Sequence, residues 1–267
     1  MTSRAAQLVL IGGGNMGSAL LGGLIAGGWT PGDITVVEIN DEKRAHLEAT
    51  YGVRTSATIV RGQGALVAVK PGDVAGVCAE LAALGVARIV SIAAGISVAR
   101  LQQASSPTTA VVRAMPNTPA LVGEGVTALC PGATCTADDI AWAESLMRAV
   151  GVVVHIAEDQ MDAFTAVAGS GPAYVFRLAE SLLAAGVAHG LAPDVADSIV
   201  RQLFKGAGVL LFESEDSPAE LRQKVTSPNG TTAAGLAEFE RSGISEIVNK
   251  VVSAASQRSA EMTRELS

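Results

Sequence analysis

The chain has 267 residues, of which 49% are hydrophobic and 17% charged, so it is long enough to bury a sizeable core in one large or two modest domains. Its formal net charge of −7, without a basic cluster, argues against nucleic acid and anionic membranes as partners. The cysteines form no CxxC pair and the three histidines are scattered. We therefore expect a reduced, cytoplasmic protein without a metal site.

The first predicted strand, Leu8–Ile11, runs into glycines and is followed by a predicted helix over Met16–Ala26. Gly12, Gly14 and Gly17 have the G-x-G-x-x-G spacing of a dinucleotide-binding turn. The first glycine permits a tight turn, the second lets a pyrophosphate approach the backbone, and the third lets the helix lie close to the sheet. Because glycine is common in this chain, a glycine-rich turn without a ligand is the competing interpretation.

Asn15 and Met16 stand where this helix begins, and free N–H groups there would face the phosphates. Residues 5–32 carry no charge and are numerous enough to span a bilayer. The glycines and Asn15 within the stretch favour a buried strand followed by a buried helix, and neither a membrane span nor a secretory signal is expected.

Apolar strands and helices alternate through the first half of the chain. Further strands are expected at Ile34–Glu38, Ala65–Val69, Ile89–Ile92, Ala110–Arg113, Gly125–Leu129 and Val152–Ile156. Helices are expected at Glu42–Thr50, Asp73–Leu84, Ser97–Gln103 (with Ser97 as its cap) and Ala137–Val150. This pattern predicts an α/β fold with a mostly parallel sheet covered on both faces, a Rossmann-type dinucleotide-binding domain over residues 1–157.

Glu38 closes the second predicted strand, where an acidic residue hydrogen-bonds the ribose hydroxyls and selects NAD. Asn40 and Arg44 follow on the next segment, and Lys43 or Arg44 could instead hold a 2′-phosphate. Both NADH and NADPH therefore fit the sequence. The alternative for Glu38 is an ordinary solvated strand end.

Three loops end later strands at the edge where open α/β sheets bind ligands. Val69, Lys70 and Pro71 form the first, and Lys70 could reach the nucleotide or a substrate carboxylate. Ala94 lies in the second and Asn117 in the third, where its amide could hold the nicotinamide carboxamide or a loop backbone. We expect the loops to gather around the nicotinamide, although proline, glycine and asparagine also form ordinary turns.

Strand signals stop after residue 157, and residues 158–267 are predicted to form an all-α domain. Helices are expected at Gln160–Ala168, Ala173–Ala188, Asp194–Glu213, Pro218–Val225, Thr231–Ser242 and Ile244–Leu266. Two of them, Asp194–Glu213 and Ile244–Leu266, are too long and apolar for a small lone bundle. A homodimer through this domain is expected, with a compact monomer as the alternative.

Small polar residues crowd the start of the helix predicted at 231, in the run Val225-Thr226-Ser227-Pro228-Asn229-Gly230-Thr231-Thr232-Ala233-Ala234-Gly235-Leu236. Backbone N–H groups and hydroxyls at such a helix start can bind a small anion such as a carboxylate. An ordinary helix cap is the simpler interpretation.

This last run occurs with four other motifs in an order that resembles the pyrroline-5-carboxylate reductase family. The others are Gly12–Gly17, Val69–Pro71, Arg113–Pro119 and Gly169–Tyr174. The resemblance spans nearly the whole chain. It implies NAD(P)H-dependent reduction of 1-pyrroline-5-carboxylate to L-proline, the last step of proline biosynthesis. It also implies a domain-swapped helical dimer, often assembled into larger rings.

The resemblance also implies roles for individual residues. Ser227, Gly230 and Thr231 match positions that bind the substrate carboxylate. Thr232 matches a threonine that hydrogen-bonds the ring nitrogen, and Glu215 an acidic residue near that nitrogen.

Asn229 is a departure from the family, which usually has a second glycine there. Asparagine tolerates a left-handed backbone, so the substrate loop is retained if it needs only that conformation. A conformation open to glycine alone would weaken substrate binding.

Two other functions compete with this interpretation. A β-hydroxyacid dehydrogenase has a similar glycine turn and helical second domain, but it carries a catalytic lysine after a glycine-rich motif, and residues 169–176 contain none. The second is a non-catalytic nucleotide-sensing protein that kept the fold.

Overall fold

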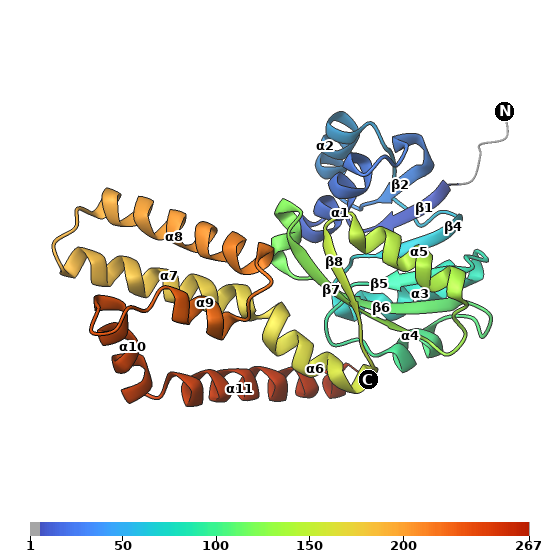
Figure 1. Ribbon diagram of the computed structural model, residues 1–267. Helices are drawn as coiled ribbons and strands as arrows, with labels where there is room; N and C mark the ends of the chain where they lie inside the picture. The colour runs from blue at the N-terminus through green and yellow to red at the C-terminus, as the bar shows by residue number, and fades with distance from the viewer. Residues whose placement is uncertain (1–5, 267) are drawn as a thin grey trace. The chain divides into compact units, whose positions relative to one another are not determined.

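The computed structural model describes residues 6–266, which form two compact units (Figure 1). One unit comprises the chain up to Ser170 and from Ala255 onward; Gly171–Ala254 form the other. The domain boundary expected after residue 157 follows the last strand. The first unit extends past that point because Met161 and Ala166 are buried in it and Ser259 donates a hydrogen bond to Asp162.

The first unit contains an eight-stranded sheet in the order β3-β2-β1-β4-β5-β6-β7-β8. The strands are β1 (Ala6–Ile11), β2 (Ile34–Val37), β3 (Arg54–Ser56), β4 (Gly62–Val67), β5 (Arg88–Ser91), β6 (Ala110–Met115), β7 (Gly125–Pro131) and β8 (Gly151–His155). All neighbours are parallel except β6 and β7. The chain leaves β1 toward β2 and later resumes at β4 on the other side, so a switch point lies between β1 and β4.

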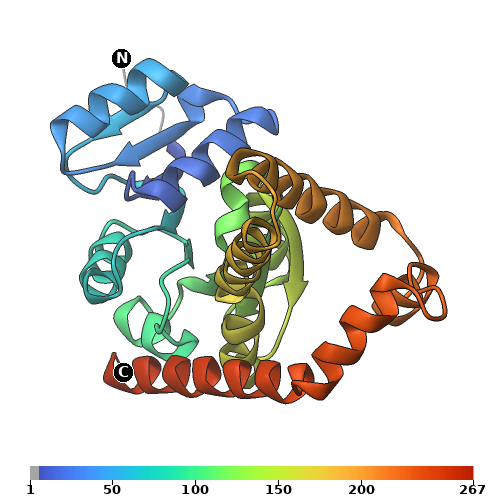
Figure 2. The same ribbon diagram turned by 90° about the vertical axis from the view of Figure 1, so that its left-hand side faces the viewer.

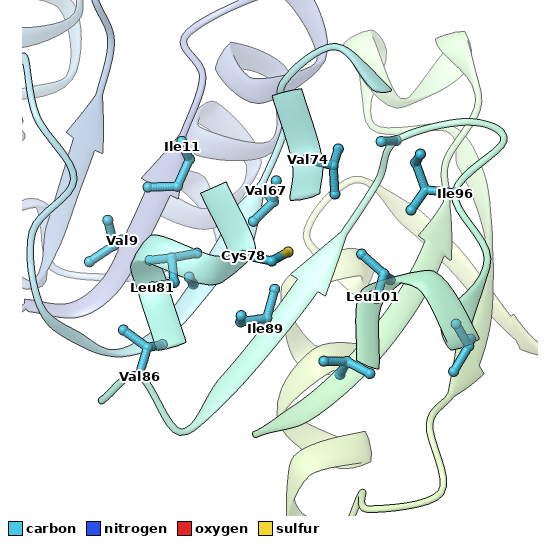
Figure 3. Packing of buried hydrophobic residues seen from close by; sticks show 14 of the residues in the cluster. Val9, Ile11, Val67, Val74, Cys78, Leu81, Val86, Ile89, Ile96 and Leu101 are labelled. Atoms are coloured by element: carbon cyan, nitrogen blue, oxygen red, sulfur yellow. The ribbon is translucent and has the colours of Figure 1, made fainter. Parts of the chain in front are cut away.

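Helices cover both faces of this sheet, as the apolar runs predict (Figure 1). They are α1 (Asn15–Ala26), α2 (Asp41–Tyr51), α3 (Val74–Ala83), α4 (Val98–Ala104) and α5 (Ala137–Arg148). Alternate residues of β1 point to opposite faces: Val9 and Ile11 pack with α3 and α4, whereas Leu8 and Leu10 pack with α1, α2 and α5. Figure 3 shows the first of these two cores around Cys78.

Two features of the sheet differ from a simple alternation of strand and helix. The short edge strand β3 has no hydrophobic pattern. Strand β7 reverses direction because the short 3₁₀ turn Thr118–Val122, and not a crossover helix, connects it to β6.

The chain continues from the sheet through α6 (Met161–Phe164) and a π-helical turn, Thr165–Gly169, into the second unit. Its helices are α7 (Gly171–Ala188), α8 (Pro193–Glu213), α9 (Pro218–Lys224), α10 (Thr231–Arg241) and the first half of α11 (Ile244–Glu265). The helix predicted at 160–168 is thus split into an α-helical and a π-helical turn. None of the helices among residues 6–266 is long and apolar enough to cross a membrane.

The second half of α11, from Ala255, is part of the first unit. Leu266 joins the core of α3 and α4, and the space that a Cβ on Gly95 would take is held by Leu266 and Met262. Figures 1 and 2 both place this end of the chain next to α4. The loop after β5 therefore rests on the C-terminal helix.

Candidate functional site

The turn between β1 and α1 has the backbone that its glycines predict. Gly12 adopts φ +105°, and a Cβ there would lie 2.5 Å from the carbonyl oxygen of Ala68. A Cβ on Gly17 would overlap the carbonyl of Gly12, so α1 could not lie this close to the sheet with a larger residue. Nothing lies within 4 Å of a Cβ on Gly14. Two glycines thus shape the turn, and the third leaves its approach open.

The N-terminus of α1 is open to a ligand. Gly14 is the N-cap and supplies no side-chain cap, and the first turn carries no acidic residue. The first N–H groups of a helix have no partner within it, and they favour an anion. Asn15 is exposed here, while the Met16 side chain packs against the core.

Glu38 follows β2 and reaches back to this turn. Its Oε2 accepts a hydrogen bond from the Gly13 N–H at 3.0 Å, and its Oε1 accepts one from the Asn40 N–H at 2.9 Å. Arg44 donates from its guanidinium to the Glu38 carbonyl at 2.7 Å and pairs with Asp41. The Asn40 side chain caps α2 by accepting from the Lys43 N–H.

A cavity of about 660 Å³ lies at the switch point between β1 and β4. Five of the predicted residues line it: Gly12, Gly14, Glu38, Val69 and Lys70. Eight others are not among its lining residues: Asn15, Met16, Gly17, Asn40, Arg44, Pro71, Ala94 and Asn117. The lining also includes Lys43, Ala57, Thr58, Ile59, Asp73 and Glu80. The segment 57–59 carries no motif, and only its position after the unpredicted strand β3 brings it here.

Asn117 is occupied by the protein backbone. Its amide nitrogen donates to the Ala168 carbonyl at 3.0 Å, its oxygen accepts from the Val126 N–H at 2.9 Å, and the residue is only 8% exposed. The sequence left two roles open for the Asn117 side chain, binding the nicotinamide carboxamide or holding a loop backbone. The structure shows hydrogen bonds of the second kind. Pro71 begins a short 3₁₀ turn, and Ala94 is half-buried beside Gly95.

The loop before α10 is a tight turn. The Gly230 N–H donates to the Ser227 carbonyl at 3.1 Å, with Pro228 and Asn229 between them. Asn229 has φ +59°, the positive value that the third residue of a type II turn requires, and proline is favoured at the second. Asn229 thus adopts the left-handed φ that asparagine tolerates.

This turn presents a free helix start. Gly230 is the N-cap of α10 and gives no side-chain cap, so the first N–H groups of the helix have no partner within it. Ser227, Thr231 and Thr232 are exposed beside it. Glu215 is exposed in the connection between α8 and α9. Its neighbour Asp216 is paired with Lys224 and Ser214, which lowers the pKa of that carboxyl.

The cysteines are packing residues. Cys78 and Cys130 are buried, and desolvation raises the pKa of each thiol to about 11, so the nucleophilic thiolate is scarce at neutral pH. Within residues 6–266, no three His, Cys, Asp or Glu side chains converge in a way that could hold a metal ion.

Two family models match separate parts of the chain. Residues 158–262 match the family model described as pyrroline-5-carboxylate reductase dimerisation, and residues 7–95 match the model described as NADP oxidoreductase, coenzyme F420-dependent. A pyrroline-5-carboxylate reductase of Synechocystis is 42% identical, over 96% of this chain and 98% of that protein.

Two solved structures show the same fold. The pyrroline-5-carboxylate reductase of Coxiella burnetii superposes with a TM-score of 0.92 at 34% identity, covering 97% of this chain and 99% of that one. The Plasmodium falciparum enzyme, solved with NADP bound, has a TM-score of 0.82 at 26% identity, covering 98% of this chain and all of that one. Full-length identity and fold agree, and the chain belongs to the pyrroline-5-carboxylate reductase family.

Proposed function

We propose that this protein reduces 1-pyrroline-5-carboxylate to L-proline with NADH or NADPH. The observation that carries the proposal is the presence of two open helix starts, at Gly14 and Gly230, in a chain 42% identical to a pyrroline-5-carboxylate reductase. The first suits the pyrophosphate of a dinucleotide and the second a small carboxylate.

The cavity at the switch point is the proposed site of the dinucleotide. The turn Gly12–Gly17 would hold the pyrophosphate, because the position of a Cβ on Gly14 is open space. Glu38 would hold the adenosine ribose, and Val69 and Lys70 line the same cavity. When bound, the reduced nicotinamide supplies the hydride for the C=N bond.

The loop before α10 would bind the substrate. Backbone N–H groups after Gly230 and the hydroxyls of Ser227 and Thr231 would hold its carboxylate. The Thr232 hydroxyl would hydrogen-bond the ring nitrogen, which carries a proton in the reactive imine. Glu215 would balance that positive charge electrostatically. The chain's own contribution is then to align the ring and to stabilise its cationic form.

A direct assay separates this reaction from its alternatives. NAD(P)H oxidation should depend on added 1-pyrroline-5-carboxylate. Oxidation of an open-chain hydroxyacid without turnover of the cyclic imine would favour a β-hydroxyacid dehydrogenase. Binding of the nucleotide without any turnover would favour a sensor.

The exposed apolar surface of the second unit supports a homodimer. Leu203, Leu210 and Phe212 are each more than half exposed on α8. A groove of about 520 Å³ between α7 and α8 is lined by Val175, Phe176 and Phe204, among others. Helices with such faces need a partner in water, and a second copy of the same unit supplies an equally apolar one. A ring of such dimers is the further assembly that family membership suggests.

The free thiols support a cytoplasmic location. Cys78, Cys130 and Cys135, the three cysteines of the chain, form no disulfide. Reduced cysteines are typical of proteins that stay in the reducing cytoplasm.

A further inference from the structure

We infer that Glu38 makes this protein selective for NADH over NADPH. The inference rests on the proposed role of the cavity at the switch point as the dinucleotide site. It concerns the ribose end of that cavity, where a fixed carboxylate would accept hydrogen bonds from two ribose hydroxyls and repel a 2′-phosphate.

The backbone N–H, the backbone carbonyl and both carboxylate oxygens of Glu38 each form a hydrogen bond within the protein. Its N–H donates to the Ser56 carbonyl at 3.0 Å, and its carbonyl accepts from Arg44 at 2.7 Å. Its two carboxylate oxygens accept from the N–H groups of Gly13 and Asn40. Each oxygen keeps further acceptor capacity for a ligand hydroxyl. The carboxylate is thus placed before the nucleotide arrives, and no rotamer has to be ordered on binding.

Gly13 is a positioning residue for this carboxylate. A Cβ at Gly13 would lie 2.7 Å from Cδ1 of Leu47 and 3.2 Å from Oε2 of Glu38. A side chain there would displace one or both. Gly13 occupies a variable position of the G-x-G-x-x-G motif, so the motif does not require a glycine there. The contacts around it do, because only a residue without a side chain leaves the Gly13 N–H free to donate to Glu38 in this position.

The charges around the cavity oppose an additional phosphate. Glu38, Asp73 and Glu80 line it with Lys43 and Lys70. Arg44 is occupied by the Glu38 carbonyl and Asp41. The cations among the described residues that line the cavity are Lys43 and Lys70. Lys43 is the one close to Glu38 in sequence, and it is exposed at the start of α2. A single solvated lysine is a weak match for a dianionic 2′-phosphate beside a fixed carboxylate.

Calorimetric titration of the purified protein with NAD⁺ and NADP⁺ tests this inference without turnover. We expect NADP⁺ to bind at least about tenfold more weakly than NAD⁺, since like charges repel at the ribose. Glu38→Gln should weaken NAD⁺ binding by about tenfold and leave or improve NADP⁺ binding. Gly13→Ala should also weaken NAD⁺ binding, although it retains the carboxylate.

Two further results make the test decisive. The control Glu42→Gln removes an exposed charge from the first turn of α2 that does not line the cavity, and should leave both affinities unchanged. Equal or tighter binding of NADP⁺ by the wild-type protein, lost in Lys43→Ala, would overturn the inference and assign the ribose end to Lys43. Failure of both nucleotides to bind would instead refute the dinucleotide site itself.

Discussion

The two units of this protein bury their apolar residues to very different extents. The sheet unit has two cores, one on each face, with β-strand residues such as Leu8, Val9 and Leu66 fully buried. In Gly171–Ala254, all of which the structure describes, the buried hydrophobic residues are Ala196 and Val200. Long apolar side chains on α7, α8 and α11 remain exposed.

This difference separates two ways of stabilising a fold. A sheet covered by helices on both faces completes its own core, and its stability needs no second chain. A set of helices whose apolar faces remain exposed to water can bury them only against another chain. The stability of such a unit therefore depends on association and on protein concentration. The sheet unit should therefore behave as a self-contained domain, and the helical unit as half of an interface.

The largest expected effect comes from placing charge on the helical unit's apolar face. Leu203→Asp combined with Leu210→Asp puts two carboxylates one heptad apart on α8. Desolvating them at an interface should weaken dimerisation by at least about 100-fold. Sedimentation equilibrium would measure this change. A dimer that persists at wild-type strength would place the interface elsewhere.

A matched double variant checks that charge alone is not the cause. Ala45→Asp with Ala49→Asp adds two carboxylates to exposed positions of α2 in the sheet unit. We expect its oligomeric state to be that of the wild-type protein, because this surface is not an apolar face.

In the sheet unit the largest effect should come from an ion pair with one buried partner, Arg113, and one half-exposed partner, Glu158. Arg113 on β6 is 3% exposed and donates to Glu158 Oε1 at 2.6 Å, and the same oxygen lies 3.3 Å from the Val98 N–H. Glu158→Ala would leave a buried guanidinium without its carboxylate, which should cost about 3 kcal/mol of unfolding free energy. Urea denaturation measures this loss.

The neighbouring Asp159 supplies the comparison for that measurement. It is exposed, so Asp159→Ala should change stability by no more than about 0.5 kcal/mol. Equal losses in the two variants would show that the pair does not stabilise the sheet unit.

Changes in the loop before α10, which we propose to bind the substrate, should lower the catalytic rate and leave the stability unchanged. Thr232→Ala removes the hydroxyl proposed to bind the imine nitrogen and should lower kcat by about 100-fold. Thr226→Ala is the control, since the Thr226 hydroxyl is already bonded to the Arg222 carbonyl. Steady-state kinetics with unchanged circular dichroism measures the effect, and an unaltered kcat would remove Thr232 from the mechanism.

Most of the sheet unit could be predicted because its strands are continuous apolar runs separated by helices. The three-residue strand β3 is polar and lies at the edge, so it leaves no hydrophobic signal. The reversal of β7 depends on the short 3₁₀ turn after Asn117, and hydrophobicity carries no information about strand direction.

The candidate site was predictable where it coincides with a motif. Gly12, Gly14 and Glu38 follow from spacing and strand ends, and they share one cavity in the structure. Thr58 and Gly13 did not follow, because the first depends on an unpredicted strand and the second on the side chain of a residue 25 positions away. The role of Asn117 also needed coordinates, since it depends on the backbone of Ala168.

The smallest effect concerns backbone strain, which the two units handle differently. In the described part of the sheet unit every residue with positive φ is a glycine, whereas the helical unit places Asn229 at φ +59°. Asn229→Gly should match or slightly exceed the wild-type stability, and Asn229→Ala should lose about 1 kcal/mol, because alanine disfavours this conformation. Thermal unfolding at one fixed protein concentration measures the order. An alanine variant as stable as the glycine variant would mean that the turn relaxes, and the loop before α10 would then be less rigid than its geometry indicates.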